Sequence, residues 1–130
     1  MNEVLEFLND CGVFFISTIE ENQPKVRPFG FVMNYEGRLS FATSNQKPIF
    51  KQLSTNPNVE ISASKDGKWI RLSGTAVFTT SNASKTKALE LMPQLKQMYS
   101  VDDNIFEIFS LENAVANIYS FQGGSKTINL

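Results

Sequence analysis

The sequence predicts a mainly β protein, in which six antiparallel strands form a small closed or split barrel with flanking helices. Runs of β-branched and aromatic residues recur between turn sequences, which is the pattern of short strands. The strands are joined mostly by short turns, and such connections imply antiparallel pairing. Glycines inside the strand patterns indicate bends, as at the corners of a small barrel. Residues 1–130 are expected to form a single domain.

The six strands are expected at residues 13–19, 25–35, 38–43, 59–64, 69–80 and 113–121. An Asp-Gly pair at Asp66 favours a hairpin, and Gly74 favours a bulge or sharp bend. Pro28 favours an edge or a bulge in the second strand, because proline donates no ladder hydrogen bond. Residues 123–127 are expected to form a flexible basic tail, and the apolar stretch at residues 105–109 is ambiguous.

Three helices complete the pattern, at residues 2–9, 48–56 and 82–92. Asn2 is a possible N-cap of the first, and Pro48 suits the first position of the second. Ser81 or Asn82 caps the third helix, and Pro93 kinks or restarts it. An apolar face formed by Leu95, Met98 and Tyr99 follows.

Composition excludes several classes of function. A net charge of −1 gives no global field for nucleic acid or an anionic membrane. The absence of histidine removes the usual general base, the serine and cysteine triads and most zinc sites, so no metal site is expected. No signal peptide or membrane span is recognisable, and a cytoplasmic protein is expected. Eleven phenylalanines in so small a chain favour burial of some of them at a subunit interface.

Residues 41–57 combine a strand end, a polar turn and a short helix. Thr43 and Ser44 offer hydroxyl groups beside a helix N-terminus, where free backbone N–H groups and the helix dipole favour phosphate. Lys47 and Lys51 are four residues apart, so if both are helical they lie on one side and could hold a dianion. The alternative is a capped helix carrying two solvated lysines.

The neighbouring strand offers a place for a flat ring. Arg27 and Phe29 project to one face, and Gly30 allows a ligand to approach the backbone closely. With the phosphate pocket alongside, the site has the shape of a mononucleotide, and flavin mononucleotide (FMN) fits best. The alternatives are a core position for Phe29, a solvated charge for Arg27 and a structural role for Trp69. The paired carboxylates Asp102 and Asp103 have no acidic cluster nearby to complete a metal site.

Four segments together resemble the pyridoxamine 5′-phosphate oxidase-like family of FMN-binding split-barrel proteins. They are VFFISTI after the first helix, KVRPFGFV, FATSNQKPIFKQLSTNP, and WIRLSGTAVF after a hairpin. The resemblance spans nearly the whole chain, and the similar branch contains small nitroimidazole-resistance-like and general stress proteins. It implies a homodimer with an FMN site in the interface. Arg27, Pro28 and Phe29 would then line the ring, and Thr43, Ser44, Lys47 and Lys51 would hold ribityl and phosphate.

The resemblance also implies that Trp69 and Lys126 contribute from the other subunit. The chain departs from the oxidase itself, because Pro48 and Ile49 occupy the places of an Arg-Lys pair, and the histidine for pyridoxamine phosphate has no counterpart. Pyridoxamine phosphate oxidation is therefore not expected. The interpretations left open are an FMN-dependent oxidoreductase acting on an unknown small molecule, a non-catalytic protein that stores or senses FMN or another cofactor, and a ligand-free dimeric scaffold. No catalytic residue is assigned.

Overall fold

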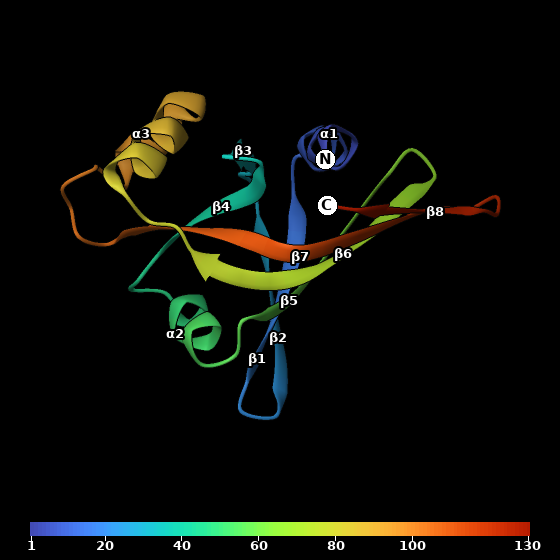
Figure 1. Cartoon of the computed structure of the whole chain (residues 1–130), viewed down its shortest axis with the longest axis horizontal. Coiled ribbons are helices and arrows are strands. Elements are labelled where there is room, and N and C mark those ends of the chain that lie inside the picture. The colour runs from blue at the N-terminus through green and yellow to red at the C-terminus, as the bar shows by residue number, and fades with distance from the viewer.

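The computed structural model describes all 130 residues and contains one antiparallel sheet with helices around it (Figure 1). The helices are α1 (Asn2–Cys11), α2 (Pro48–Thr55), α3 (Asn82–Leu91) and the 3₁₀ helix η1 (Pro93–Gln97). The strands are β1 (Phe14–Glu20), β2 (Gln23–Phe29), β3 (Met33–Tyr35), β4 (Arg38–Ser44), β5 (Asn58–Lys65), β6 (Lys68–Phe78), β7 (Phe106–Ser120) and β8 (Ser125–Asn129). None of the helices combines the length and apolar character needed to cross a membrane.

The strand order is β2-β1-β5-β6-β7-β4-β3, and β8 pairs with β7. Every pairing is antiparallel. The two outermost strands, β2 and β3, follow one another in the chain but do not pair, so the curled sheet stays open between them. The predicted fold class, an antiparallel split barrel with flanking helices, is confirmed.

The structure has eight strands where six were predicted. The predicted second strand is interrupted after Phe29 and forms β2 and β3, which lie at opposite ends of the sheet. The expected flexible tail is strand β8, paired with β7 from Tyr119 to Val115. Of the ambiguous stretch at residues 105–109, all but the first residue belong to β7, which pairs with both β4 and β6. The hairpin at Asp66, the bulge at Gly74 and the Ser81 cap are confirmed.

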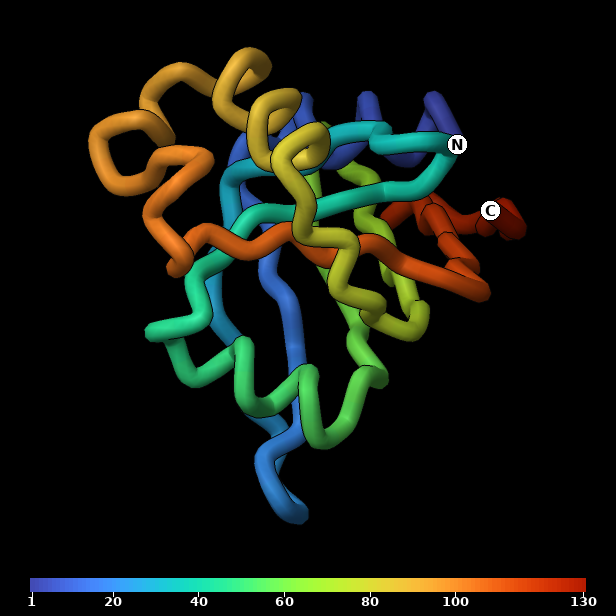
Figure 2. The backbone as a smooth tube through the Cα atoms, turned by 60° about the vertical axis from the view of Figure 1, so that its left-hand side comes forward, coloured from blue at the N-terminus to red at the C-terminus, as the bar shows by residue number.

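The main core lies inside the curled sheet and is closed by helices. Val4 and Leu8 of α1 and Ile49 and Leu53 of α2 join the same buried cluster as the inward side chains of the strands. Figures 1 and 2 place α1 and α2 at different ends of the sheet, and the chain termini lie close together in both views. A second buried cluster lies under α3 and η1 and includes Phe106 and Tyr99.

Aromatic rings connect the core to α2. Phe41 stacks on Phe109 at a centroid distance of 5.2 Å, and Phe109 also contacts Phe29 at 6.1 Å. Phe78 joins Phe109 at 6.3 Å and Phe50 of α2 at 4.8 Å. Phe41 and Phe109 are fully buried, whereas Phe29, Phe50 and Phe78 are partly buried around them.

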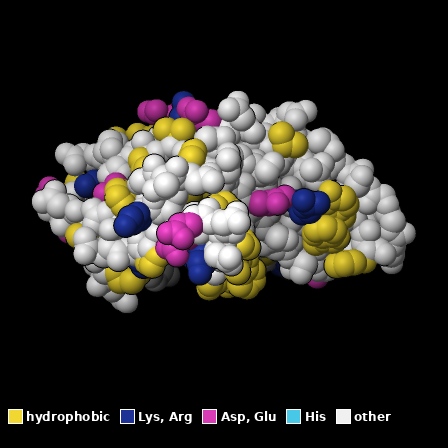
Figure 3. All heavy atoms as spheres, turned by 90° about the horizontal axis from the view of Figure 1, so that it is seen from below, with side chains coloured by type: hydrophobic (Ala, Val, Ile, Leu, Met, Phe, Trp, Pro, Cys, Tyr) yellow, Lys and Arg dark blue, Asp and Glu magenta, His cyan; other side chains and the backbone are white.

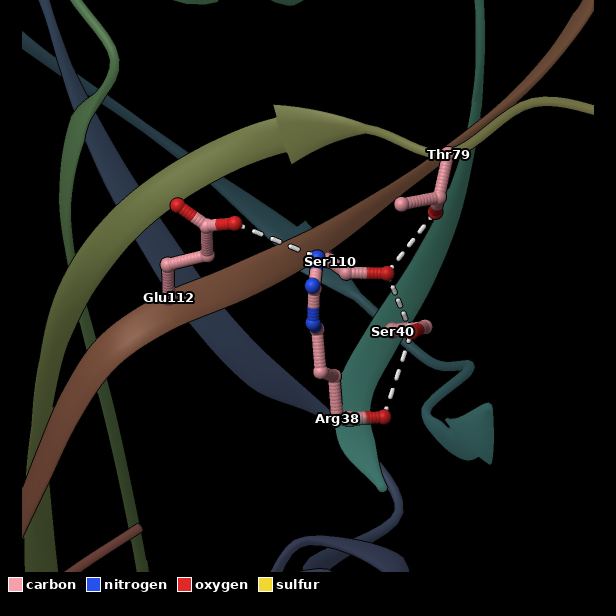
Figure 4. Close-up of polar contacts among 5 residues, drawn as sticks. All are labelled: Arg38, Ser40, Thr79, Ser110 and Glu112. Atoms are coloured by element: carbon pink, nitrogen blue, oxygen red, sulfur yellow. Dashed lines mark hydrogen bonds and ion pairs between the residues drawn. The ribbon is translucent and has the colours of Figure 1, made fainter. Parts of the chain in front are cut away.

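A row of hydroxyl groups, from Ser40 of β4 and Ser110 of β7 to Thr79 just after β6, runs across the sheet (Figure 4). The Oγ atom of Ser110 lies 2.7 Å from Ser40 Oγ and 2.7 Å from Thr79 Oγ1. Ser40 donates onward to the Arg38 carbonyl oxygen at 3.2 Å, and the Arg38 side chain pairs with Glu112 at 3.3 Å. Each of these hydroxyls has a hydrogen-bond partner, and the row links strands that are distant in sequence.

Candidate functional site

The open edge of the sheet leaves a stretch of backbone without partners. Residues 30–32 connect β2 to β3 across the opening, and none of their N–H or C=O groups takes part in a hydrogen bond. Phe31 and Val32 are nevertheless buried, with 7% and 5% of their surfaces exposed. Backbone groups at buried positions are nearly always paired, so this stretch is suited to receive the polar edge of a ligand.

A pocket of about 220 Å³, which we call the gap pocket, lies against this stretch. Its walls are mostly apolar, and Lys47 is its one charged residue. The lining residues are Pro28, Phe29, Gly30, Phe31, Ala42, Lys47, Met92, Leu95, Met98 and Tyr99. The pocket thus brings the predicted ring segment, Pro28 and Phe29, together with Lys47 from the predicted phosphate turn. An apolar hollow with few polar groups is the usual form of a small-molecule site.

The two lysines are arranged differently from the prediction. Lys47 is the N-cap of α2 and has extended backbone angles, φ −96° and ψ 149°, so it does not stack on Lys51 along one helix face. Lys51 lines another pocket, of about 420 Å³, together with Glu20 and Glu21. A phosphate near Lys51 would therefore meet two carboxylates, whereas the gap pocket has no acidic residue beside Lys47. Pro48 occupies the first helical position as predicted.

Thr43 and Ser44 end strand β4, and Ser44 also begins the turn, because its carbonyl accepts the Lys47 N–H at 3.1 Å. The Oγ atom of Ser44 accepts the Gln46 N–H at 3.0 Å. Thr43 Oγ1 is the one fully buried side-chain polar atom without a hydrogen-bond partner. A buried hydroxyl without a hydrogen bond lowers the stability of the fold by about 1–3 kcal/mol. Because side chains alternate along a strand, Thr43 lies on the face opposite Ala42 and does not line the gap pocket.

Arg27 is neither a solvated charge nor a lining residue of the gap pocket. Its guanidinium donates to the Ile16 carbonyl at 3.2 Å, to Thr18 Oγ1 at 2.8 Å and to Gln52 Oε1 at 2.6 Å. Thr18 and Gln52 are buried, and burial lowers the pKa of Arg27 from its ordinary value. This network fastens α2 to β1 and β2. No local pattern pointed to Gln52, because its partners Arg27 and Thr18 lie 25 and 34 residues away in the chain.

Trp69 and Lys126 lie outside the gap pocket. Trp69 stacks on Tyr119 at a centroid distance of 4.4 Å and lines a shallow pocket with Val13, Phe15 and Phe121. Lys126 pairs with Glu3 of the same chain at 2.8 Å. Their contribution to a site in a partner subunit stays a prediction.

Residues after α3 form the wall that the site prediction omitted. Met92, Leu95, Met98 and Tyr99 face the β2–β3 connection across the gap pocket. The helical spacing of Leu95, Met98 and Tyr99 after Pro93 indicated an apolar face. That pattern could not show what the face covers, because a core and a ligand pocket require the same residue types.

Comparisons with known proteins agree with the fold. The family model described as "Pyridoxamine 5'-phosphate oxidase" matches residues 1–113. A NimC/NimA family protein from Clostridium acetobutylicum is 46% identical, with a TM-score of 0.96, and the match covers 100% of this chain and 92% of that chain. A comparison with curated proteins finds no match.

More distant structures share the fold. A pyridoxamine 5′-phosphate oxidase-related, FMN binding protein from Nostoc punctiforme is 14% identical with a TM-score of 0.60, covering 99% of this chain and 95% of that chain. A heme binding protein from Mycobacterium smegmatis is 16% identical with a TM-score of 0.72, covering 91% of this chain and 52% of that chain. At these identities the likeness concerns the fold alone, and the two proteins bind different cofactors.

Proposed function

The chain belongs to the pyridoxamine 5′-phosphate oxidase family, and from this premise we propose that it is an FMN-binding flavoprotein that acts as an oxidoreductase on a small molecule. The observation that carries the proposal is the gap pocket, where the unpaired backbone of residues 30–32 meets apolar walls and the ammonium group of Lys47. A flavin ring is flat, largely apolar on its faces and polar along one edge, and its phosphate is anionic. The pocket offers a complementary group for each of these parts.

Different residues of the chain would contact different parts of the cofactor. Pro28, Phe29 and the backbone of residues 30–32 are suited to the ring, because amide groups can fix a polar edge while side chains cover a face. Lys47 and the Ser44 turn are suited to the phosphate side. Thr43 lies on the opposite face of β4, so its unsatisfied hydroxyl would not contact a group bound in the gap pocket. Arg27 would act indirectly, by holding α2 in place.

Flavin supplies the redox chemistry when it is bound, and the protein supplies binding, orientation and electrostatics. The gap pocket contains no carboxylate and the chain has no histidine. The protein's own side chains there are therefore suited to bind and to exclude water more than to move protons. The lack of a carboxylate in the gap pocket and of histidine in the chain also favours a second candidate, a non-catalytic protein that stores or senses FMN.

A second copy of the chain would complete the site. The gap pocket, about 220 Å³, is smaller than the roughly 300–1,000 Å³ typical of sites for drug-sized ligands, so the whole of FMN needs additional walls. Val13, Phe15 and Phe121 expose 55%, 48% and 70% of their surfaces around the Trp69 pocket. Grouped exposed apolar side chains of this kind are suited to a homodimer interface. Figure 3 shows the molecule from below, where apolar groups of side chains alternate with charges of both signs.

The first experiment is to record the absorbance of the purified protein and to titrate the flavin-free protein with FMN. We expect the bands of oxidised flavin and saturable binding. Lys47→Ala should weaken FMN binding about tenfold or more, because a hydrogen bond to a charged group is lost. Lys51→Ala should have a smaller effect, because that lysine lies beside two carboxylates. FMN affinity unchanged by Lys47→Ala would show that the phosphate assignment is wrong.

A second experiment separates the two candidate functions. Reduced nicotinamide is added without oxygen to the FMN-loaded protein, and the flavin absorbance is followed. Bleaching within seconds to minutes supports an oxidoreductase, whereas flavin that stays oxidised supports storage or sensing. Protein that never binds FMN would contradict both.

A further inference from the structure

Tyr99 is held rigidly in the wall of the gap pocket. Its side chain is buried, with 8% of its surface exposed, and its ring stacks on Phe106 at a centroid distance of 4.6 Å and an interplanar angle of 7°. Its backbone N–H donates to the Leu95 carbonyl at 2.9 Å. The ring therefore has one well-defined position opposite the β2–β3 connection.

Hydrogen bonds from two charged side chains, Lys85 and Asp103, hold the loop that follows Tyr99. Lys85, itself 8% exposed, donates from Nζ to the Val101 carbonyl at 2.7 Å. The Asp103 carboxylate accepts N–H groups from Ser100 at 2.9 Å, Ile105 at 2.9 Å and Phe106 at 3.0 Å. The loop thus keeps both Tyr99 and its stacking partner in place.

The Tyr99 hydroxyl, in contrast, makes no hydrogen bond within the chain. Thr43 Oγ1 is the one unpartnered side-chain polar atom that is fully buried, so the Tyr99 phenol oxygen keeps some accessible surface, and Tyr99 is a lining residue of the gap pocket. Hydroxyl groups of buried tyrosines usually find a partner. A rigid tyrosine with a free hydroxyl at a pocket wall is typical of a group whose partner is a ligand atom.

We infer that Tyr99 is a ligand-binding residue of the gap pocket, and that its hydroxyl donates to an acceptor oxygen of a small planar ligand whose anionic or electron-rich edge also faces Lys47. The pocket suits this class because its walls are apolar, its single charge is positive and its volume suits a ring without large substituents. The oxygen has two possible sources, the edge of the flavin or the substrate. Whether the oxygen belongs to the flavin or to the substrate rests on the proposed function, whereas the role of Tyr99 in binding does not.

The test uses Tyr99→Phe, which keeps the ring and removes only the hydroxyl. Tyr35→Phe is the matched control, because the Tyr35 hydroxyl also makes no hydrogen bond but does not line the gap pocket. Lys47→Met and its surface control Lys96→Met test the positive charge in the same way. FMN affinity is measured by titrating flavin-free protein. Affinity for benzoate, and for the neutral benzyl alcohol, is measured by calorimetry on FMN-loaded and flavin-free protein.

A loss of about tenfold in FMN affinity in Tyr99→Phe identifies the flavin edge as the partner. A loss of about tenfold in benzoate affinity with FMN affinity unchanged identifies a substrate oxygen, and benzyl alcohol should then be insensitive to Lys47→Met. If both affinities stay within twofold of wild type, or if Tyr35→Phe lowers them equally, the inference is wrong. If the wild-type protein binds no FMN, the proposed function fails, and benzoate binding to the flavin-free protein alone decides the role of Tyr99. Absence of that binding as well overturns the inference.

Discussion

At the scale of single residues, Arg27 bears a charge that is stabilised without a carboxylate in direct contact. Its guanidinium is partly removed from water, which lowers its pKa, and three oxygen acceptors replace the lost hydration. The Gln52 oxygen accepts from both Arg27 and Thr18, while its amide donates to Glu20 at 3.3 Å. This network sets the position of α2 and therefore of Lys47, the N-cap of that helix, at the gap pocket.

Asp103 gives a prediction about pH. Burial raises the pKa of its carboxyl, but three backbone N–H groups and the nearby charge of Lys85 outweigh this effect and hold the pKa below its usual 3.8. A carboxylate whose pKa is lower in the folded state stabilises the fold above the unfolded pKa, and this stabilisation is lost as pH falls through the folded value. The free energy of unfolding of wild type should therefore exceed that of Asp103→Asn at pH 6–7, by an amount that shrinks below about pH 4.

Urea unfolding across this pH range measures the difference. Asp102→Asn is the control, because Asp102 accepts none of the three amide hydrogen bonds. If the difference in the free energy of unfolding between wild type and Asp103→Asn did not depend on pH, the Asp103 carboxylate would not be the group that stabilises this loop.

The positions of the site residues could be predicted only where the strands and turns that carry them are adjacent in the expected barrel. Pro28, Phe29 and Lys47 could be placed together, because the strand and the turn that carry them belong to one small barrel. Arg27 and Lys51 were each assigned a direct role on the basis of residue type. Their hydrogen bonds and neighbours depend on Gln52, Glu20 and Glu21, whose approach is set by how α2 packs on the sheet. Tyr99 enters the site from an insert whose path the local pattern does not determine.

At the scale of elements, local signals predicted turns, caps and bulges well. Asp-Gly at Asp66, Gly74 in β6 and Ser81 before α3 each determine a backbone conformation within a few residues. The break between β2 and β3 and the pairing of β8 were not predicted, because both depend on partners elsewhere in the chain. The β pattern continues through residues 30–32, but no strand lies beside them. Residues 125–129 are mostly polar and still form a strand, because they can hydrogen-bond to the edge of β7.

The capping of α3 gives a prediction about stability. The Ser81 side chain accepts the Ser84 N–H at 3.0 Å, and Ser84 Oγ in return accepts the Ser81 N–H at 2.9 Å. Removing a serine cap leaves helix N–H groups unpaired and costs about 0.5–2 kcal/mol. Ser81→Ala should therefore lower the free energy of unfolding by about 1 kcal/mol. The matched control is Ser54→Ala, since Ser54 donates to the Phe50 carbonyl inside α2 and its loss should change stability by less than about 0.5 kcal/mol. Chemical unfolding of both variants checks the comparison, and equal losses would contradict the capping role.

At the scale of the whole molecule, the fold class followed from the sequence because period-2 patterning, short turns and glycine bends agree with one another. The opening of the sheet could not be predicted in this way, because it arises from the strand order and not from any single segment. This opening has the greatest consequence for function. It leaves the backbone of residues 30–32 without hydrogen bonds, and it places the gap pocket at the sheet edge.

The proposed homodimer gives a prediction at this scale. Phe15 projects from β1, exposes 48% of its surface and lines the Trp69 pocket with Val13 and Phe121. Burying these rings against a second copy would remove apolar surface from water, and a carboxylate in their midst would have to be buried unpaired. Phe15→Glu should therefore convert the dimer to a monomer in sedimentation velocity, with an unchanged circular dichroism spectrum and weaker FMN binding. Leu91→Glu is the control, because Leu91 is also exposed, at 58%, but lies on α3 outside this patch. A wild-type protein that sediments as a monomer, or a Phe15→Glu protein that stays dimeric, would show that the second copy docks elsewhere or not at all, and the remaining walls of the cofactor site would then have to come from the single chain.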